Sequence, residues 1–167
     1  MSRFAWSVSP LRAGPLAVKA PHFPAKAKNV IALAAGGADG LRLGDNAKAA
    51  LVARGLAEMS RLAEAAGGKP ETFAGLAGIG DLAVTCWAAS GRNRRAGELI
   101  AQGTDPAEAV QEIGMVVEGL TTAPVLRTLS HRLGVELPIT EGVCSVLSGT
   151  SLHELVAGLM GREPTQE

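Results

Sequence analysis

The helical spacing of apolar residues between Asn46 and Ala66 limits the fold of this chain more than any other feature. The apolar positions follow the i, i+4, i+7 pattern of one helix face, and they are Val52, Leu56, Met59, Ala63 and Ala66. Gly67-Gly68 follows directly, as is common at the C-terminal end of a helix. No alternating run of β-branched residues is long enough to predict a strand, and the nearest is LGVELPI. The sequence therefore predicts an all-α fold.

Further helix starts are predicted by residues suited to the first turn. Asp105 precedes Pro106 and stands three residues before Glu108. The Asp105 carboxylate can accept hydrogen bonds from the free backbone amides at a helix start, and Pro106 and Glu108 are both favoured in the first turn. Weaker signals of the same kind predict starts at Asp45 or Asn46, Lys69-Pro70-Glu71, Pro138-Ile139-Thr140-Glu141 and Ser151. Together with the apolar segments, these signals indicate about eight helices.

Two apolar segments contain residues that weaken helices. Residues 28–41, KNVIALAAGGADGL, are predicted to form a helix that is loosened by Gly36 and Gly37. A second helix is predicted over residues 120–133, with Pro124 in its first turn, where proline is tolerated. The composition is 47% hydrophobic but only 3% aromatic, which indicates that the helices pack closely through small residues.

Charge is distributed unevenly along a chain whose net charge is zero. Residues 1–38 contain basic but no acidic side chains, whereas every acidic residue lies from Asp39 onward. A nucleic-acid-binding domain would instead carry a basic face on its folded part. Cys86 and Cys144 do not have metal-site spacing, and no apolar run approaches the roughly 20 residues of a membrane span. These features predict a cytoplasmic protein with reduced thiols, no membrane span and no nucleic-acid partner.

The chain divides into three parts by composition. Residues 1–27 are punctuated by proline and show no persistent apolar period, so we expect a poorly ordered lead-in. The helical signals extend over residues 28–162, which predicts a single helical domain there. Residues 163–167 are expected to form a short tail.

Basic residues gather at one predicted helix start. Ser90-Gly91 is followed by Arg92, Asn93, Arg94 and Arg95, and then by AGELIAQG, a plausible helix. Free backbone amides at a helix N-terminus, together with guanidinium groups, form a phosphate site, and glycine lets the backbone approach the anion. The alternative is a solvated turn with surface arginines.

Several single residues allow both a chemical and a structural interpretation. Lys28, next to Asn29, precedes an apolar run. Its ammonium group is either desolvated, which would suit a general acid, or extends to the solvent at the protein surface. Asp81 is either a helix cap or the partner of a cation, and Thr85 lies one turn further on the same face. Glu118 suits the start of a helix, where it complements the dipole.

Metal and hydrolase chemistry have no support in the sequence. The three histidines, His22, His131 and His153, are isolated from cysteines and acids at ligand spacing. Ser90 and Cys86 have no histidine nearby, so a nucleophile–base pair is not predicted. We therefore expect no metal site.

Five motifs in this order resemble the C-terminal half of the NAD(P)-dependent glycerol-3-phosphate dehydrogenases. They are KNVIALAAGGADGLRLGDNAKAALVARGLAEM, GLAGIGDLAVTC, GRNRRAG, VVEGL and LPITEGV. The likeness extends from about Lys26 to Arg162. It implies an all-helical substrate domain of the 6-phosphogluconate-dehydrogenase C-terminal-like type, which agrees with the helices predicted above.

The resemblance also implies residue roles. Lys28 matches the family's proton donor and acceptor at the substrate oxygen, with Asn29 supporting it. Asp81 matches the residue that orients this lysine and binds substrate, and Thr85 matches a threonine near the substrate. Arg92 and Asn93 match the family's phosphate-binding pair. Positions that contact the nicotinamide nucleotide are matched by Arg92, Val116 and Glu118.

Two departures from the family pattern stand out. Gly91 occupies a position where bacterial members often have serine, and its backbone amide is expected to serve in place of the hydroxyl. The family also begins with a Rossmann domain, yet this chain has no G-x-G-x-x-G after a strand, and residues 1–25 do not resemble the usual preceding segment. We expect a truncated, frameshifted or fused form in which NAD or NADP binding is incomplete.

The resemblance implies an oxidoreductase that interconverts dihydroxyacetone phosphate and sn-glycerol 3-phosphate with NAD(P)H and supplies glycerophospholipid precursors. The alternative is a catalytically incompetent helical domain that binds a phosphate ligand or self-associates, including as a homodimer, through the face that a Rossmann domain would cover. A third interpretation, RNA binding through RNRR, would require strongly salt-dependent affinity.

Overall fold

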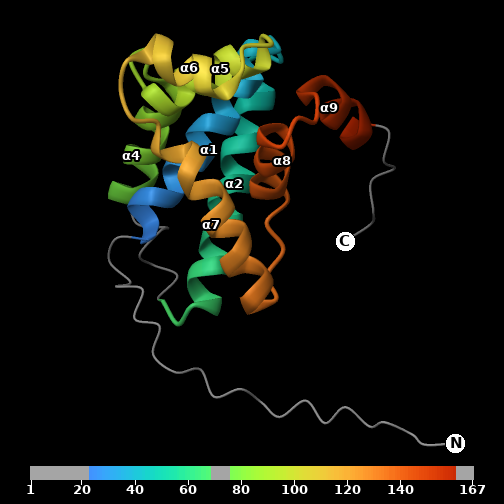
Figure 1. The fold of residues 1–167 in the computed structure, drawn as a ribbon. Helices are drawn as coiled ribbons and strands as arrows, with labels where there is room; N and C mark the ends of the chain where they lie inside the picture. The colour runs from blue at the N-terminus through green and yellow to red at the C-terminus, as the bar shows by residue number, and fades with distance from the viewer. Residues whose placement is uncertain (1–22, 69–75, 161–167) are drawn as a thin grey trace, which may run out of the picture.

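The computed structural model describes residues 23–68 and 76–160, which contain only helices and no strand (Figure 1). The helices are α1 (Phe23–Gly40), α2 (Asp45–Ala65), α4 (Leu76–Trp87), α5 (Arg92–Ala101), α6 (Pro106–Ile113), α7 (Glu118–Leu133), α8 (Pro138–Leu147) and α9 (Leu152–Met160). The predicted all-α fold is confirmed. Within these ranges, no helix is both long and apolar enough to cross a membrane. The predicted start at Lys69-Pro70-Glu71 lies outside the described residues.

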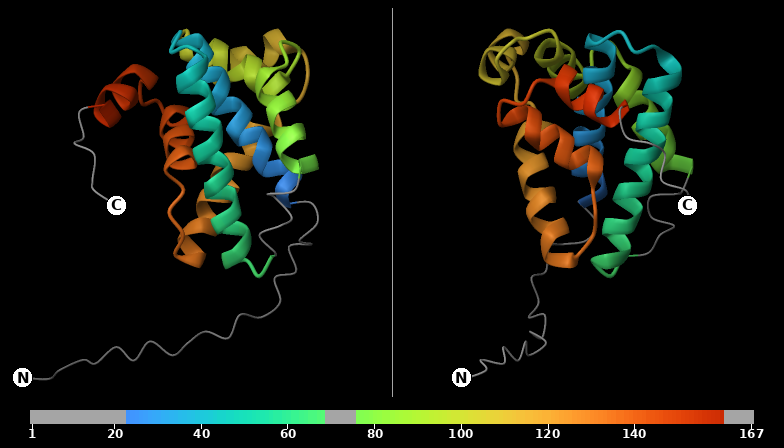
Figure 2. Two further views of the ribbon diagram at one scale, coloured as in Figure 1. Left: turned by 180° about the vertical axis from the view of Figure 1, so that it is seen from behind. Right: turned by 90° about the vertical axis from the view of Figure 1, so that its right-hand side faces the viewer.

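Helix α1 occupies the centre of the fold, and α2, α4, α5, α7 and α8 all contact it (Figures 1 and 2). It begins at Phe23, earlier than the predicted Lys28, and Ala27, which precedes the predicted start, is fully buried in the core. A helix that is apolar on every side belongs in the interior. The buried hydrophobic residues of α1 are Ala27, Val30, Ile31, Ala32, Leu33, Ala35 and Ala38.

Glycines bring the backbones of α1 and α5 into direct contact. A Cβ atom at Gly36 would overlap a carbonyl oxygen of α5, and a Cβ atom at Gly97 would overlap a carbonyl oxygen of α1. The prediction that Gly36 and Gly37 loosen the first helix is wrong, because α1 continues through both of them. The missing side chain of Gly36 instead permits the close approach of α5, and a Cβ atom at Gly37 would lie 3.1 Å from the Leu152 side chain of α9.

Three predicted helix starts agree with the structure. Asp105 is the N-cap of α6, and its Oδ1 atom accepts the N–H of Ala107 at 2.8 Å. Pro138 is the first residue of α8, where its missing N–H costs nothing. Helix α9 begins directly after Ser151, whose carbonyl oxygen accepts the N–H of Leu155.

Two other helix-start predictions are wrong. The N-cap of α2 is Gly44, at a φ of 84°, and not Asp45 or Asn46, both of which lie inside the helix. Glycine is suited to this left-handed conformation because it has no Cβ. Pro124 lies in the interior of α7 and not in its first turn, because the helix already begins at Glu118.

Glu58 caps α8 from the neighbouring helix α2. Its carboxylate accepts the N–H of Ile139 at 2.7 Å and the N–H of Thr140 at 3.4 Å. The N-cap residue of α8, Leu137, has no side chain that could do this. Glu58 is 2% exposed, and burial raises its pKa above the ordinary 4.5, although the two backbone hydrogen bonds act in the opposite direction.

The raised pKa of Glu58 predicts a specific pH dependence of stability. The folded state holds the Glu58 proton more tightly than the unfolded state does, so this contribution to stability is complete below pH 4.5 and is lost as the pH rises through the folded pKa. We expect the wild type to lose stability relative to Glu58→Gln as the pH rises above 4.5 and through the folded pKa. Urea unfolding of both proteins across this range measures the difference, and parallel profiles would contradict the prediction.

Candidate active site

Lys28 and Asp81 form an ion pair between the first turns of α1 and the middle of α4. The Lys28 Nζ atom lies 2.5 Å from the Asp81 Oδ2 atom, with the lysine side chain 27% exposed and the aspartate side chain 56% exposed. Of the two interpretations of Asp81, the structure supports the partner of a cation, since the residue lies within α4 and not at its start. Thr85 is one turn away, and its hydroxyl donates to the Asp81 carbonyl oxygen at 2.6 Å.

A second set of contacts joins α1, α5 and α7 beside this ion pair. The Asn29 Nδ2 atom donates to Glu118 Oε2 at 2.9 Å, and the Gly119 N–H donates to Asn93 Oδ1 at 2.8 Å. A Cβ atom at Gly119 would lie 2.7 Å from the Asn29 carbonyl oxygen, so only glycine fits there. The KN, RN and VVEGL motifs therefore meet at one point, although they are far apart in the sequence.

The structure gives the basic residues at the start of α5 different roles. Arg94 binds Asp39, with 2.6 Å between Nε and Oδ2, and Arg95 Nη2 lies 2.8 Å from Glu112 Oε1. Arg92 is exposed and forms no ion pair with any residue in the described ranges. Its guanidinium group is therefore available for an external anion.

Gly91 is the N-cap of α5 but does not supply a free amide. It has an extended conformation without a side-chain cap, and its N–H donates to the Ala88 carbonyl oxygen at 2.9 Å. The expectation that the Gly91 amide replaces a serine hydroxyl stays a prediction, and it would require this hydrogen bond to be given up. The amides available to an anion are those of the first turn of α5, which begins at Arg92, because such amides have no partner within the helix.

Sequence analysis missed the charge cluster that holds α5 in place. Asp39 of α1 binds both Arg94 and Lys48 of α2, and the distance from Lys48 Nζ to Asp39 Oδ2 is 2.7 Å. The Lys48 side chain is only 4% exposed, and its ammonium group lies 5.0 Å from the ring centroid of Trp87. Helical spacing could reveal none of these pairs, because the partners belong to different helices.

Exposed apolar side chains lie near the polar residues. Met115 and Val116 are in the segment between α6 and α7, separated from Glu118 by the buried Val117, and Val116 is 69% exposed. On α4, Val84 lies one turn from Asp81 and is 66% exposed. No side chain within residues 23–68 and 76–160 covers these positions, so they can contact a larger ligand or another domain.

Both cysteines are buried free thiols. Cys86 is fully buried, and desolvation raises the pKa of its thiol to about 11. Cys144 is also a buried free thiol with a raised pKa. No group of three His, Cys, Asp or Glu side chains suited to a metal ion occurs among the described residues. The polar groups left for chemistry here include the Lys28–Asp81 pair and the exposed Arg92.

The architecture and the site define the class of this protein as a helical substrate domain of a dehydrogenase. Residues 22–157 match the family model described as NAD-dependent glycerol-3-phosphate dehydrogenase C-terminus. Because the match covers most of the chain, this protein belongs to the NAD-dependent glycerol-3-phosphate dehydrogenase family through its C-terminal domain. The relatives are NAD(P)-dependent oxidoreductases, as their names state.

Individual relatives agree with this assignment. The chain is 50% identical to glycerol-3-phosphate dehydrogenase [NAD(P)+] of Nitrosospira multiformis, over 84% of this chain and 42% of that protein. It is 51% identical to the Moorella thermoacetica protein of the same name, over 87% of this chain and 44% of the relative. The crystal structure of glycerol-3-phosphate dehydrogenase from Coxiella burnetii matches with a TM-score of 0.79 and 42% identity, covering 84% of this chain and 43% of that one. The chain thus spans less than half the length of these relatives.

Proposed function

We propose that this chain is the substrate and proton-transfer part of a glycerol-3-phosphate dehydrogenase. The observation that carries the proposal is the Lys28–Asp81 ion pair, together with an exposed Arg92 at the start of α5 that forms no ion pair with the described residues. The hydrogen bonds of Asn29 and Asn93 connect these two places through α7. A small phosphorylated ketone needs both an anion site and a proton donor at its carbonyl oxygen.

The proposed reaction interconverts dihydroxyacetone phosphate and sn-glycerol 3-phosphate. Arg92 and the first-turn amides of α5 bind the phosphate group, with Asn93 holding the first turn of α7 against α5. As the carbonyl carbon receives a hydride, the Lys28 ammonium group donates a proton to the carbonyl oxygen, and Asp81 holds the ammonium group in position. In the reverse direction the lysine amine accepts the hydroxyl proton.

Nicotinamide cofactor, NAD or NADP, supplies and accepts the hydride when bound. The described residues fit one edge of such a nucleotide, because exposed Val116 offers an apolar contact and Arg92 has a free guanidinium group. Glu118 is engaged by Asn29 and so is held at the same edge. A nucleotide-binding half is required to complete the site.

Reconstitution of activity tests the proposal. The nucleotide-binding half of the Nitrosospira multiformis relative is added to this chain, either as a fusion or as a separate protein. We expect oxidation of NADH or NADPH that depends on dihydroxyacetone phosphate. Comparing the reaction rates with NADH and with NADPH shows which cofactor is preferred. The relative's half alone is the control. A correctly folded fusion that binds cofactor but does not reduce dihydroxyacetone phosphate would overturn the proposed reaction.

The phosphate role of Arg92 predicts a difference between two neighbouring arginines. Arg92→Ala should weaken binding of sn-glycerol 3-phosphate to the chain by roughly tenfold, because a charge-assisted hydrogen bond is lost. Arg95→Ala is the matched control, since that side chain is also exposed but already paired with Glu112. NMR titration of both variants measures the effect. Equal losses would show that the cluster attracts anions only through its total charge.

The exposed apolar residues of α4 favour a second candidate function, self-association without catalysis. Ile79, Val84 and Trp87 are all substantially exposed on this helix. A homodimer would cover them, and light scattering of the purified chain tests this, with a monomer at high concentration arguing against it. Binding of RNA has less support, since Arg94 and Arg95 are engaged by carboxylates. The proposal places the reaction in the cytoplasm, in the supply of glycerophospholipid precursors.

A further inference from the structure

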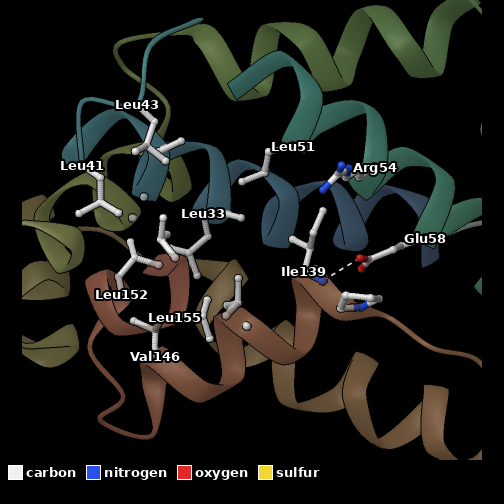
Figure 3. A pocket seen from close by; sticks show the side chains of 18 of the residues that line it. Leu33, Leu41, Leu43, Leu51, Arg54, Glu58, Ile139, Val146, Leu152 and Leu155 are labelled. Carbon is white, nitrogen blue, oxygen red and sulfur yellow. Dashed lines mark hydrogen bonds between the residues drawn. The ribbon is translucent and has the colours of Figure 1, made fainter. Parts of the chain in front are cut away.

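An apolar cavity of about 500 Å³ opens between α1, α2, α8 and α9, and Lys28, Asp81 and Arg92 are not among the residues that line it (Figure 3). Its size is within the range of small-molecule sites, which are roughly 300–1,000 Å³. Leucine, isoleucine and valine side chains form most of its wall, among them Leu33, Leu51, Val146 and Leu155. No step of the proposed reaction uses this cavity.

The cavity has a polar end and an apolar end. Figure 3 shows Arg54 and Glu58 beside Ile139 at one end, while Leu41, Leu43 and Leu152 lie together at the other. A ligand that fills the cavity would therefore be polar at one end and aliphatic along the rest of its length.

The polar end carries a net positive charge. Arg54, Glu58 and Arg61 share one face of α2, because they are spaced by three or four residues. Glu58 is already occupied by the backbone N–H groups at the start of α8. Neither arginine forms an ion pair with a residue of the described ranges. Two cations facing one carboxylate leave an excess positive charge, which favours an anionic head group.

We propose that this cavity binds an anionic amphiphile, an aliphatic chain with a carboxylate or phosphate head. The head lies at Arg54 and Arg61, and the chain extends toward Leu41, Leu43 and Leu152. This proposal does not depend on the dehydrogenase reaction, so the failure of one leaves the other standing.

Calorimetric titration of the full chain with simple probes tests the site. Hexanoate, octanoate and decanoate should bind with affinity that rises about fourfold for each added methylene until the cavity is full. Octanoate and octyl phosphate should both bind more tightly than octanol, and octyltrimethylammonium should bind least. Comparing octanoate with octyl phosphate identifies the preferred head group.

Two variants separate the charge from the apolar wall. Arg54→Glu should weaken octanoate binding by about tenfold while leaving octanol unchanged. Arg132→Glu is the matched control, because Arg132 is an exposed arginine in the last turn of α7 and does not line the cavity. Val146→Trp fills the cavity and should abolish binding of every probe, with circular dichroism confirming that the variant is folded.

Two results would overturn the proposal. Equal affinity for octanol and octanoate, unaffected by Arg54→Glu, would mean that the arginines do not select an anion. The second is a dimer that persists in the presence of octanoate but is absent in Val146→Trp. It would mean that a second copy of the chain covers the cavity. Probe affinities in the expected order, together with weaker octanoate binding by Arg54→Glu, would support an anionic amphiphile as the ligand.

Discussion

Replacing Gly97 with alanine is expected to destabilise the fold by about 3 kcal/mol or more, because overpacking at a backbone contact cannot be relieved by rotating a side chain. A Cβ atom at this position would overlap the Leu33 carbonyl oxygen, lie 2.8 Å from the Leu33 carbonyl carbon and lie 3.0 Å from the Gly37 nitrogen. The central helix α1 and helix α5 would have to separate. Urea unfolding followed by circular dichroism measures the loss.

Gly80 offers a matched control for this experiment. It is also a helical glycine, in α4, but a Cβ atom there would meet nothing within 4 Å. Gly80→Ala should be neutral or stabilise the protein by up to about 1 kcal/mol, since alanine favours the helix. If the two variants had the same stability, close backbone contact would not be the reason for glycine at position 97.

Replacing Lys28 with alanine in the reconstituted enzyme is expected to lower turnover by about 10³-fold or more. The proposed reaction needs a proton at the developing alkoxide, and Lys28, held by Asp81 at 2.5 Å, is the group placed to donate it. Because the lysine side chain is partly exposed, the stability of the fold should change little. Steady-state kinetics and thermal unfolding measured on the same preparations separate the two effects.

Lys26→Ala is the control for the Lys28 variant. Lys26 lies on the same helix, half a turn away, and is exposed. Its removal should leave turnover within about twofold of the parent, because a surface charge outside the site contributes little. Turnover retained in Lys28→Ala would remove this residue from the proposed mechanism and leave its role as binding only.

The local part of the fold was predictable because the signals for it are local. Asp105, Pro106 and Glu108 predict a helix start through contacts within one turn, and the structure confirms it. The errors arose where a distant segment decides the outcome. Gly36 weakens a helix when considered alone, yet in the structure it lies against the backbone of α5, where a side chain could not fit.

The same distinction applies to the site. Motif resemblance brought Lys28, Asp81, Arg92 and Asn93 together as candidates, but no spacing rule predicts that Lys28 reaches Asp81 across 53 positions. Nor could sequence separate the arginines of RNRR. Only the positions of Asp39 and Glu112 show that Arg94 and Arg95 are engaged while Arg92 is left unpaired among the described residues.

The sequence by itself determined the helical class, several helix starts and the family, because these depend on patterns within short segments. The tertiary structure decided which glycines allow close helix contacts, which arginine of RNRR is unpaired among the described residues and where the apolar cavity opens. Those properties come from helices that meet only after folding, and the free energy of each contact depends on the partner across the interface. Helix α1 shows both contributions: its apolar residues predict a helix, and its packing against α5 and α7 builds the site.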